Sequence, residues 1–303
     1  MHILATEGLT KRFPTVTALD SLTVGVGTGV TGLVGANGAG KSTLIKILLG
    51  LLPPTSGGAK VLDLDVLTQG TEIRRLVGYM PEHEALPPDV SATEFVVHLA
   101  RMSGLPRTAA RERAADVLRH VGLAEERYRA MGGYSTGMKQ RVKLAQALVH
   151  DPKLVFLDEP TNGLDPRGRD EMLALIRRIG TDFGISVLVT SHLLGELERI
   201  CDHVIVIDAG RLLRSSAITE FTQATQSLTV EVEEGMQPLA ERLTSRGGQV
   251  TQHGRLLLVK VDGPETFDEI RDAVVDLDLC LIRLEQGRHR IEDVFREEAA
   301  GVD

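Results

Sequence analysis

The segment from Gly35 to Thr43 combines glycines, a lysine and two hydroxyl residues at a spacing that indicates phosphate binding. It reads Gly35-Ala36-Asn37-Gly38-Ala39-Gly40-Lys41-Ser42-Thr43 and matches the pattern of a phosphate-binding loop, or P-loop. Glycines let the backbone curl so that successive N–H groups point at phosphate oxygens, and the following helix adds partial positive charge at its N-terminus. We expect Lys41 to reach the outer phosphates and Ser42 to supply a hydroxyl to Mg²⁺. The alternative, a glycine-rich turn with an incidental lysine, does not account for the full pattern between an apolar strand and a helical run.

Two adjacent carboxylates, Asp158 and Glu159, follow the apolar run 154–157. A strand buried on both faces does not end in two acids for the sake of packing, because unpaired buried carboxylates are costly. Asp158 is therefore the expected partner of magnesium, and Glu159 is placed to accept a proton from the attacking water. A plain strand-end cap is the alternative, and the P-loop upstream argues against it.

These segments require an α/β scaffold to position them, and the first two thirds of the chain has the pattern of one. Apolar, β-branched runs at 30–34, 61–64, 154–157, 187–189 and 204–207 predict strands covered on both faces. Between Pro81 and Tyr134 the apolar spacing becomes helical. We therefore predict a helical subdomain at about 83–150 within an α/β domain covering residues 1–220.

A second, smaller domain is predicted at residues 221–303. The stretch 215–227 is polar and rich in Ser, Thr and Gln, which indicates a linker. Beyond it, an alternating run at 228–232, helical spacing around Leu239 and Leu243, and an apolar run at 256–261 follow one another. Helical spacing from Phe267, an extended run at 277–284 and a short helix at 291–295 complete a small α+β domain.

Composition and charge limit the function classes. The net charge of −8 argues against nucleic-acid binding, which normally needs a basic face. Two cysteines do not make a disulfide framework or a metal cluster. No apolar run approaches the roughly 20 residues that a membrane helix needs, so we expect any membrane role to come through a partner.

Four further elements, in this order along the chain, resemble motifs of the ATP-binding-cassette (ABC) family. Tyr134-Ser135-Thr136-Gly137-Met138 resembles the signature motif, Thr161-Asn162-Gly163-Leu164-Asp165 the D-loop, and Thr190-Ser191-His192 the segment with the switch histidine. Phe13 lies where the family keeps an aromatic side chain that stacks on adenine. The resemblance covers residues 3 to 210 without a gap, and the motifs together are far more specific than any one of them.

The resemblance implies a P-loop NTPase cassette that uses ATP and Mg²⁺. Ser135 and Gly137 stand at a predicted helix N-terminus, where a hydroxyl, a backbone N–H and the helix dipole can face a phosphate. In the family that phosphate belongs to ATP on the P-loop of a second copy, so a head-to-tail homodimer is implied. His192 would assist hydrolysis, and Asp165 would contribute to the shared site.

Two positions depart from the usual family pattern. Thr136 replaces a frequent glycine, which matters if that position needs a positive φ. Glu82 replaces the usual glutamine that contacts magnesium and the attacking water, and a carboxylate also serves a hard cation. We therefore expect Glu82 to be both a metal-site and a catalytic residue, with its detailed role open.

Within the family, Glu82, the Tyr-Ser-Thr-Gly-Met signature and the tail segment Ile291-Glu292-Asp293-Val294-Phe295 resemble the bacterial drug-export branch. This implies a cytoplasmic subunit, peripheral on the inner face of the cell membrane, that drives a separate transmembrane permease. The helical subdomain would offer the groove for a short helix of that permease. An ABC importer ATPase and a non-transport ABC ATPase are the alternatives.

Overall fold

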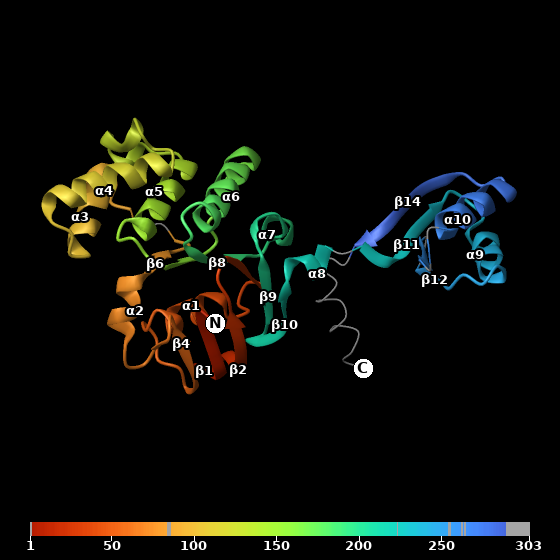
Figure 1. The fold of residues 1–303 in the computed structure, drawn as a ribbon, viewed down its shortest axis with the longest axis horizontal. Coiled ribbons are helices and arrows are strands. Elements are labelled where there is room, and N and C mark those ends of the chain that lie inside the picture. Colours follow the sequence, from red (N-terminus) through yellow and green to blue (C-terminus); the bar gives the residue numbers. More distant parts are fainter. Residues whose placement is uncertain are drawn as a thin grey trace. The chain divides into compact units, whose positions relative to one another are not determined.

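The computed structural model describes residues 2–83, 86–222, 224–253, 256–261, 263 and 265–288 (Figure 1). The chain divides into two compact units, residues 1–218 and 219–303. The division lies close to the boundary proposed from the sequence, and each unit is described by itself.

A six-stranded sheet forms the centre of the first unit. Its order is β10 (Arg211–Ala217), β9 (His203–Asp208), β3 (Val30–Val34), β8 (Ser186–Ser191), β7 (Leu154–Leu157) and β6 (Val77–Met80). All neighbouring strands are parallel except β10, which is antiparallel to β9. Every residue of β3, β7 and β8 is buried, as the apolar runs predicted, and the predicted α/β architecture is confirmed.

A second, antiparallel sheet packs into the same core and was largely missed by the sequence patterns. Its order is β2 (Thr17–Val26), β1 (Leu4–Arg12), β4 (Ser56–Val61) and β5 (Leu64–Asp65). The strand predicted at 61–64 is wrong, because Leu62 and Asp63 form a turn between β4 and β5 with φ of 52° and 65°. Positive φ reverses the chain there although the side chains read as a continuous apolar run.

Helices connect the strands of the first unit. They are α1 (Lys41–Leu48), α2 (Gly70–Leu76), α3 (Ala92–Met102), α4 (Arg107–His120), α5 (Thr136–Leu148), α6 (Pro166–Thr181) and α7 (Leu194–Ile200), with 3₁₀ turns η1 (Glu126–Tyr128) and η2 (Met131–Gly133). Figure 1 shows α3, α4 and α5 gathered together, which are the helices of the predicted helical subdomain. The α3 helix begins in a capping box in which Ser91 and Glu94 satisfy each other's backbone N–H groups. No helix in the described part of the chain is long and apolar enough to cross a membrane.

The stretch 215–227, predicted as a linker, contains the division between the two units after residue 218, but helix and strand occupy most of it. The stretch contains the end of β10, the short helix α8 (Ile218–Thr222) and the start of β11 (Ala224–Val232). Ser215, Ser216 and Ala217 pair with Ile205, Val204 and His203 of β9. Backbone pairing to a neighbouring strand, which a polar side-chain pattern does not reveal, holds this segment in the sheet.

The second unit is a split βαβ arrangement. Its elements are β11, α9 (Met236–Ser245), β12 (Val250–His253), β13 (Leu256–Lys260), α10 (Glu265–Asp276) and β14 (Leu281–Arg288). The sheet order β12-β13-β11-β14 is antiparallel throughout, the pattern of a β-α-β-β-α-β unit. Only residues from Leu281 onward of the extended run predicted at 277–284 are a strand, since Leu277 and Leu279 instead pack against the core after α10. The short helix predicted at 291–295 lies outside the described residues.

Candidate functional site

The loop between β3 and α1 has the backbone geometry that a phosphate-binding loop needs. Gly38 and Gly40 have φ of 87° and 104°, in the region that favours glycine. A Cβ at Gly40 would lie 2.4 Å from the carbonyl oxygen of Ala18. No side chain caps the N-terminus of α1, and its first turn contains no acid. The first N–H groups of α1 are therefore left to an external acceptor.

Lys41 is buried at the start of α1 and is held by main-chain oxygens. Its Nζ donates to the carbonyl oxygens of Gly35, at 2.7 Å, and Ala36, at 3.3 Å. The same Nζ lies 3.6 Å from Oε1 of Glu159, and both side chains are only 7% exposed. The lysine charge is thus compensated inside the site by the loop carbonyls and one carboxylate.

The two acids predicted at the end of β7 are fixed by Thr190, which the sequence analysis named only as part of the switch-histidine segment. Thr190 of β8 donates its hydroxyl to Oδ1 of Asp158 at 2.8 Å, and its Oγ1 accepts from the N–H of Glu159 at 2.8 Å. Thr190 is fully buried, and Glu159 has φ of 49°. The left-handed backbone at a non-glycine residue is strained, and the hydroxyl bridge supports it.

Glu159 faces two different partners with its two carboxylate oxygens. Oε2 lies 2.9 Å from Nδ1 of His192, which follows β8. Oε1 is buried and accepts no hydrogen bond among the described residues, with Lys41 as its neighbouring cation. The predicted base, switch histidine and lysine are therefore brought together.

Glu82 lies in the same pocket and is tied to two other elements. Its main-chain oxygen accepts from Nζ of Lys143 on α5 at 2.8 Å, and Asn162 Nδ2 is 3.5 Å from its Oε1. The carboxylates of Asp158 and Glu82 also act on Tyr79, because burial first and these two charges next raise the pKa of its hydroxyl to about 12. Lys143 is a residue that the sequence patterns missed.

These residues line one pocket of about 300 Å³, here called the P-loop pocket. Its walls comprise Ala18, Ala36, Asn37, Gly38, Gly40, Lys41, Ser42, Thr43, Glu82, Asp158 and Glu159. Gly35 and Ala39 lie in the loop behind it, where a Cβ on Gly35 would be 2.5 Å from the carbonyl oxygen of Ile207.

The donors of the P-loop pocket fit magnesium. Ser42 offers a hydroxyl, and Asp158 and Glu82 offer carboxylates, all hard oxygen ligands. No cluster of three or more acids, histidines or cysteines forms a cage in the described part of the chain. Mg²⁺ usually takes one or two carboxylates and keeps water and phosphate oxygens as its other ligands, so a cage is not required.

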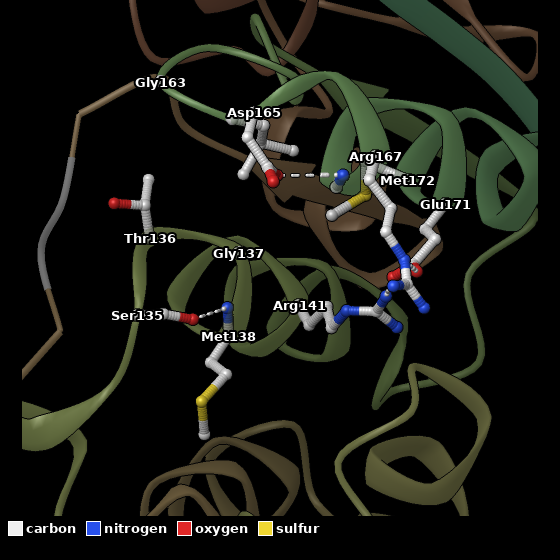
Figure 2. A pocket seen from close by; sticks show the side chains of 12 residues that line it. Ser135, Thr136, Gly137, Met138, Arg141, Gly163, Asp165, Arg167, Glu171 and Met172 are labelled. Atoms are coloured by element: carbon white, nitrogen blue, oxygen red, sulfur yellow. Dashed lines mark hydrogen bonds and ion pairs between the residues drawn. The ribbon is translucent and has the colours of Figure 1, made fainter.

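A second pocket, here called the α5–α6 pocket, contains the remaining predicted site residues except Phe13. It has a volume of about 540 Å³, and its lining includes Ser135, Gly137 and Asp165. Figure 2 shows Ser135 and Asp165 capping two helices, with Ser135 Oγ accepting from the N–H of Met138 at 3.3 Å and Asp165 Oδ1 accepting from the N–H of Gly168 at 2.9 Å. The N-termini of α5 and α6 both open on this pocket. None of its lining residues belongs to the P-loop pocket.

Charges in the α5–α6 pocket pair with one another. Glu171 lies 2.7 Å from Arg141 and 3.1 Å from Arg167, and Figure 2 shows both guanidinium groups beside its carboxylate. Thr136 begins α5 without a positive φ, so the departure from glycine there costs no backbone strain.

Phe13 lies in neither pocket lining. It is 40% exposed in the turn after β1, with the ammonium of Lys11 5.3 Å from its ring centroid. This exposure contradicts a core role and leaves the ring available for stacking.

Comparisons with known proteins agree with this geometry. The family model described as ABC transporter matches residues 20–162. The daunorubicin/doxorubicin resistance ATP-binding protein DrrA of Streptomyces peucetius is 36% identical, over 82% of this chain and 77% of the relative. The bacitracin transport ATP-binding protein BcrA of Bacillus licheniformis is 39% identical, over 70% of this chain and 68% of the relative. The structure of cbiO1 from Clostridium perfringens, part of the ABC transporter complex cbiONQ, matches with a TM-score of 0.66 and 30% identity, over 72% of this chain and 90% of that one.

Proposed function

Since this chain belongs to the ABC transporter family of ATP-binding proteins, we propose that it hydrolyses ATP to drive export through a separate membrane-spanning subunit. The observation that carries the proposal is the P-loop pocket, where a buried lysine and two strand-end carboxylates face one space. A pocket built only to bind nucleotide has no need of a buried acid whose free oxygen faces the phosphate site.

In this proposal the phosphates of ATP lie on the backbone N–H groups of the loop and of α1. Lys41 exchanges its loop carbonyls for phosphate oxygens, which are stronger acceptors because they are charged. Ser42 and Asp158 would hold Mg²⁺, with Glu82 beside them. The ion would neutralise charge on the phosphates.

Glu159 acts as the general base on the attacking water. When Lys41 turns to phosphate, Oε1 of Glu159 keeps no other partner among the described residues and is free to accept a proton. His192, at 2.9 Å from the other oxygen, orients the carboxylate. Thr190 keeps the backbone of Glu159 in its strained conformation.

The α5–α6 pocket is proposed to receive nucleotide from a second copy. Ser135 and Gly137 stand at the N-terminus of α5, but they do not line the P-loop pocket of their own chain. A head-to-tail homodimer would put each α5 N-terminus against the phosphate held by the partner, with Asp165 as a further contact. Phe13 would stack on the adenine of the nucleotide bound to its own P-loop. Hydrolysis then depends on two chains.

Export is proposed over import because of the relatives. Two of them are named for drug resistance and for bacitracin transport. A permease that carries the membrane spans would place this subunit at the cytoplasmic face of the membrane.

The proposal is tested with Glu159→Gln. Glutamine keeps the shape but does not accept the proton of water, so hydrolysis should fall by about 10²- to 10⁴-fold. The change also removes a negative charge close to the γ-phosphate, so ATP binding should be retained. Size-exclusion chromatography with Mg²⁺ and ATP should show a dimer that is absent with ADP.

Two controls make the test specific. Glu112→Gln, an exposed glutamate on α4, should change neither hydrolysis nor dimerisation. The double variant Glu159→Gln/Ser135→Arg should lose the ATP-dependent dimer. Full hydrolysis by Glu159→Gln refutes the base assignment, and a dimer that survives Ser135→Arg refutes the composite site.

A further inference from the structure

On the basis of ATP hydrolysis as the proposed function of the P-loop pocket, we propose that Glu196 of α7 is a positioning residue for that reaction. Its carboxylate holds together the two segments that carry Glu159 and His192. Glu196 is only 6% exposed although it is an acid, and it does not belong to the described lining of either pocket. A buried acid beside the catalytic segments therefore has no role yet.

One oxygen of this carboxylate joins two segments of the chain. Oε2 of Glu196 accepts a hydrogen bond from the hydroxyl of Thr161 at 2.7 Å and another from the hydroxyl of Ser191 at 3.3 Å. Both hydroxyl residues are buried. Thr161 follows Glu159 by two residues, and Ser191 directly precedes His192. The segment after β7 and the end of β8 thus meet at a single acceptor.

The other oxygen connects Glu196 to α6. Oε1 lies 3.0 Å from Nε of Arg169, which is in the first half of that helix. Burial of a carboxylate is costly unless the group is paired and hydrogen-bonded. Two hydroxyl donors and one guanidinium meet this requirement only while all three segments keep their places. The burial of Glu196 therefore favours one arrangement of these segments over others.

The contacts of Glu196 are a second tie between the catalytic segments. The first tie is Thr190, whose hydroxyl bonds to Asp158 and to the N–H of Glu159. Two segments joined at one point can still turn about that point, and a second contact further along removes this freedom. Each of Glu159 and His192 lies within two residues of both ties, and their side chains are 2.9 Å apart. The two ties together fix how these side chains face each other.

Loss of this second tie should affect turnover and not ATP binding. The described lining of the P-loop pocket contains none of Thr161, Ser191 and Glu196. In the proposed mechanism Glu159 takes a proton only when its carboxylate points at the attacking water. A misplacement of about 1 Å in such a group can cost about 10²-fold in rate. Positioning through Glu196 therefore predicts a lower kcat at unchanged ATP affinity.

Turnover and ATP affinity of three full-chain variants test the proposal. Glu196→Ala removes the shared acceptor, so kcat should fall by about ten- to a hundredfold while the Kd for ATP is unchanged. Glu196→Gln keeps an acceptor oxygen and should recover most of the rate. Thr161→Val removes one donor with little change of volume, and its kcat should fall by about tenfold. This variant keeps the test decisive if Glu196→Ala does not fold.

The matched control is Asp202→Ala. Asp202 also connects a strand to α6, because it accepts from the N–H of Val30 at 2.9 Å and lies 2.7 Å from Arg177. Val30 is the first residue of β3, whose other end leads into the P-loop. Loss of this contact should lower the melting temperature and leave kcat and ATP affinity unchanged.

A double-mutant cycle with His192→Ala gives a reading that a purely structural role would not change. If Glu196 acts through the contact between Glu159 and His192, adding Glu196→Ala to His192→Ala should cost little further turnover. Independent damage to the fold would instead multiply the two losses.

Four results would overturn the proposal. They are wild-type kcat in both Glu196→Ala and Thr161→Val, a fall in ATP affinity and melting temperature that parallels kcat, multiplied losses in the double variant, and a Glu196→Gln variant as slow as Glu196→Ala. The last would mean that the charge facing Arg169 matters and not the hydroxyl contacts. Failure of the proposed function is read separately, from full hydrolysis by Glu159→Gln.

Discussion

The P-loop pocket and the α5–α6 pocket differ in where their charges meet. In the P-loop pocket, Lys41 and Glu159 face each other across the space that a ligand would enter, and both are almost fully buried. In the α5–α6 pocket, Glu171 pairs with Arg141 and Arg167, of which Arg167 is 88% exposed. In the proposed mechanism, Lys41 of the first pocket changes partners when phosphate binds. The second offers two helix N-termini, and its two carboxylates are already engaged, because Asp165 caps α6 and Glu171 pairs with the two arginines.

Replacing the cation of each pocket should give the largest difference between them. We expect Lys41→Ala to weaken ATP binding by at least about thirtyfold, because the variant loses the cation that pairs with the outer phosphates, and truncating one partner of such a charge pair costs roughly 2 kcal/mol or more of binding free energy. Arg141→Ala should leave the ATP affinity of the isolated chain unchanged. Isothermal titration calorimetry measures both, with circular dichroism to check folding. Similar losses in the two variants would contradict the division of roles.

The hydroxyl bridge of Thr190 is a second difference between the two pockets, because it has no counterpart in the α5–α6 pocket. Thr190→Val keeps the volume but leaves Asp158 and the N–H of Glu159 without their partner. Turnover should fall by at least about tenfold, since a hydrogen bond to a charged group contributes about 1.5 to 3 kcal/mol. More Mg²⁺ should be needed for half-maximal rate. Thr190→Ser retains the hydroxyl and should recover most of the rate; a Ser variant as slow as Val would mean that packing matters and not the bridge.

A comparison of two helix-capping serines, Ser91 and Ser135, can distinguish a structural role of Ser135 from a functional one. Ser91 caps α3 and Ser135 caps α5, so each change to Ala should cost about 1 kcal/mol of unfolding free energy. Only Ser135→Ala should also lower ATP hydrolysis, because Ser135 faces the α5–α6 pocket. Urea unfolding and steady-state hydrolysis give the two readings. Hydrolysis lowered equally by both variants would leave Ser135 with a capping role alone.

Phe13→Ala tests how far the P-loop pocket extends. Loss of a stacking contact should weaken ATP binding by about 1 kcal/mol, or roughly fivefold. The melting temperature without nucleotide should not change, because the ring is 40% exposed. A lower melting temperature with unchanged ATP affinity would mean that Phe13 packs in the protein core and does not stack on ATP.

Removal of the second unit should have the smallest effect. The two main apolar clusters of the units share no residue, and every proposed ATP contact lies before residue 218. A chain ending at Thr222 should fold and bind ATP with unchanged affinity. Loss of folding would show that the units depend on each other. A cut at Ser227, the end of the predicted linker, would fall inside β11 and leave part of a strand exposed.

Sequence patterns predicted most of the strands that are buried on both faces, although they missed the largely buried β6. The apolar runs 30–34 and 154–157 coincide with β3 and β7, because short continuous apolar runs are typical of strands covered on both faces. The strands β1 and β2 were missed, since they are half exposed and mix Thr, Gly and Lys with apolar residues. The last three residues of β10 were read as linker because pairing with β9, rather than side-chain polarity, defines that strand.

The same limit applies to the site. Lys41, Asp158 and Glu159 were found because their chemistry follows from local order along the chain. Thr190 and Lys143 act on residues 32 and 61 positions away, through one hydroxyl and one ammonium. The spacing of neighbouring residues along the chain does not reveal such distant contacts. The order of strands β7 and β8 in the sheet, once known, would place Thr190 beside Asp158.

The hydrogen bonds of Lys41 to Gly35 and Ala36 have a consequence for selectivity. Without nucleotide, the ammonium already has two acceptors and a carboxylate nearby, so entry of a ligand is an exchange and not a simple gain. A nucleoside without phosphates offers the ammonium no acceptor, so Lys41 would keep its hydrogen bonds to Gly35 and Ala36. A triphosphate replaces neutral carbonyl oxygens with charged ones. If the loop binds ATP as proposed, we expect these internal hydrogen bonds of Lys41 to favour a triphosphate over adenosine.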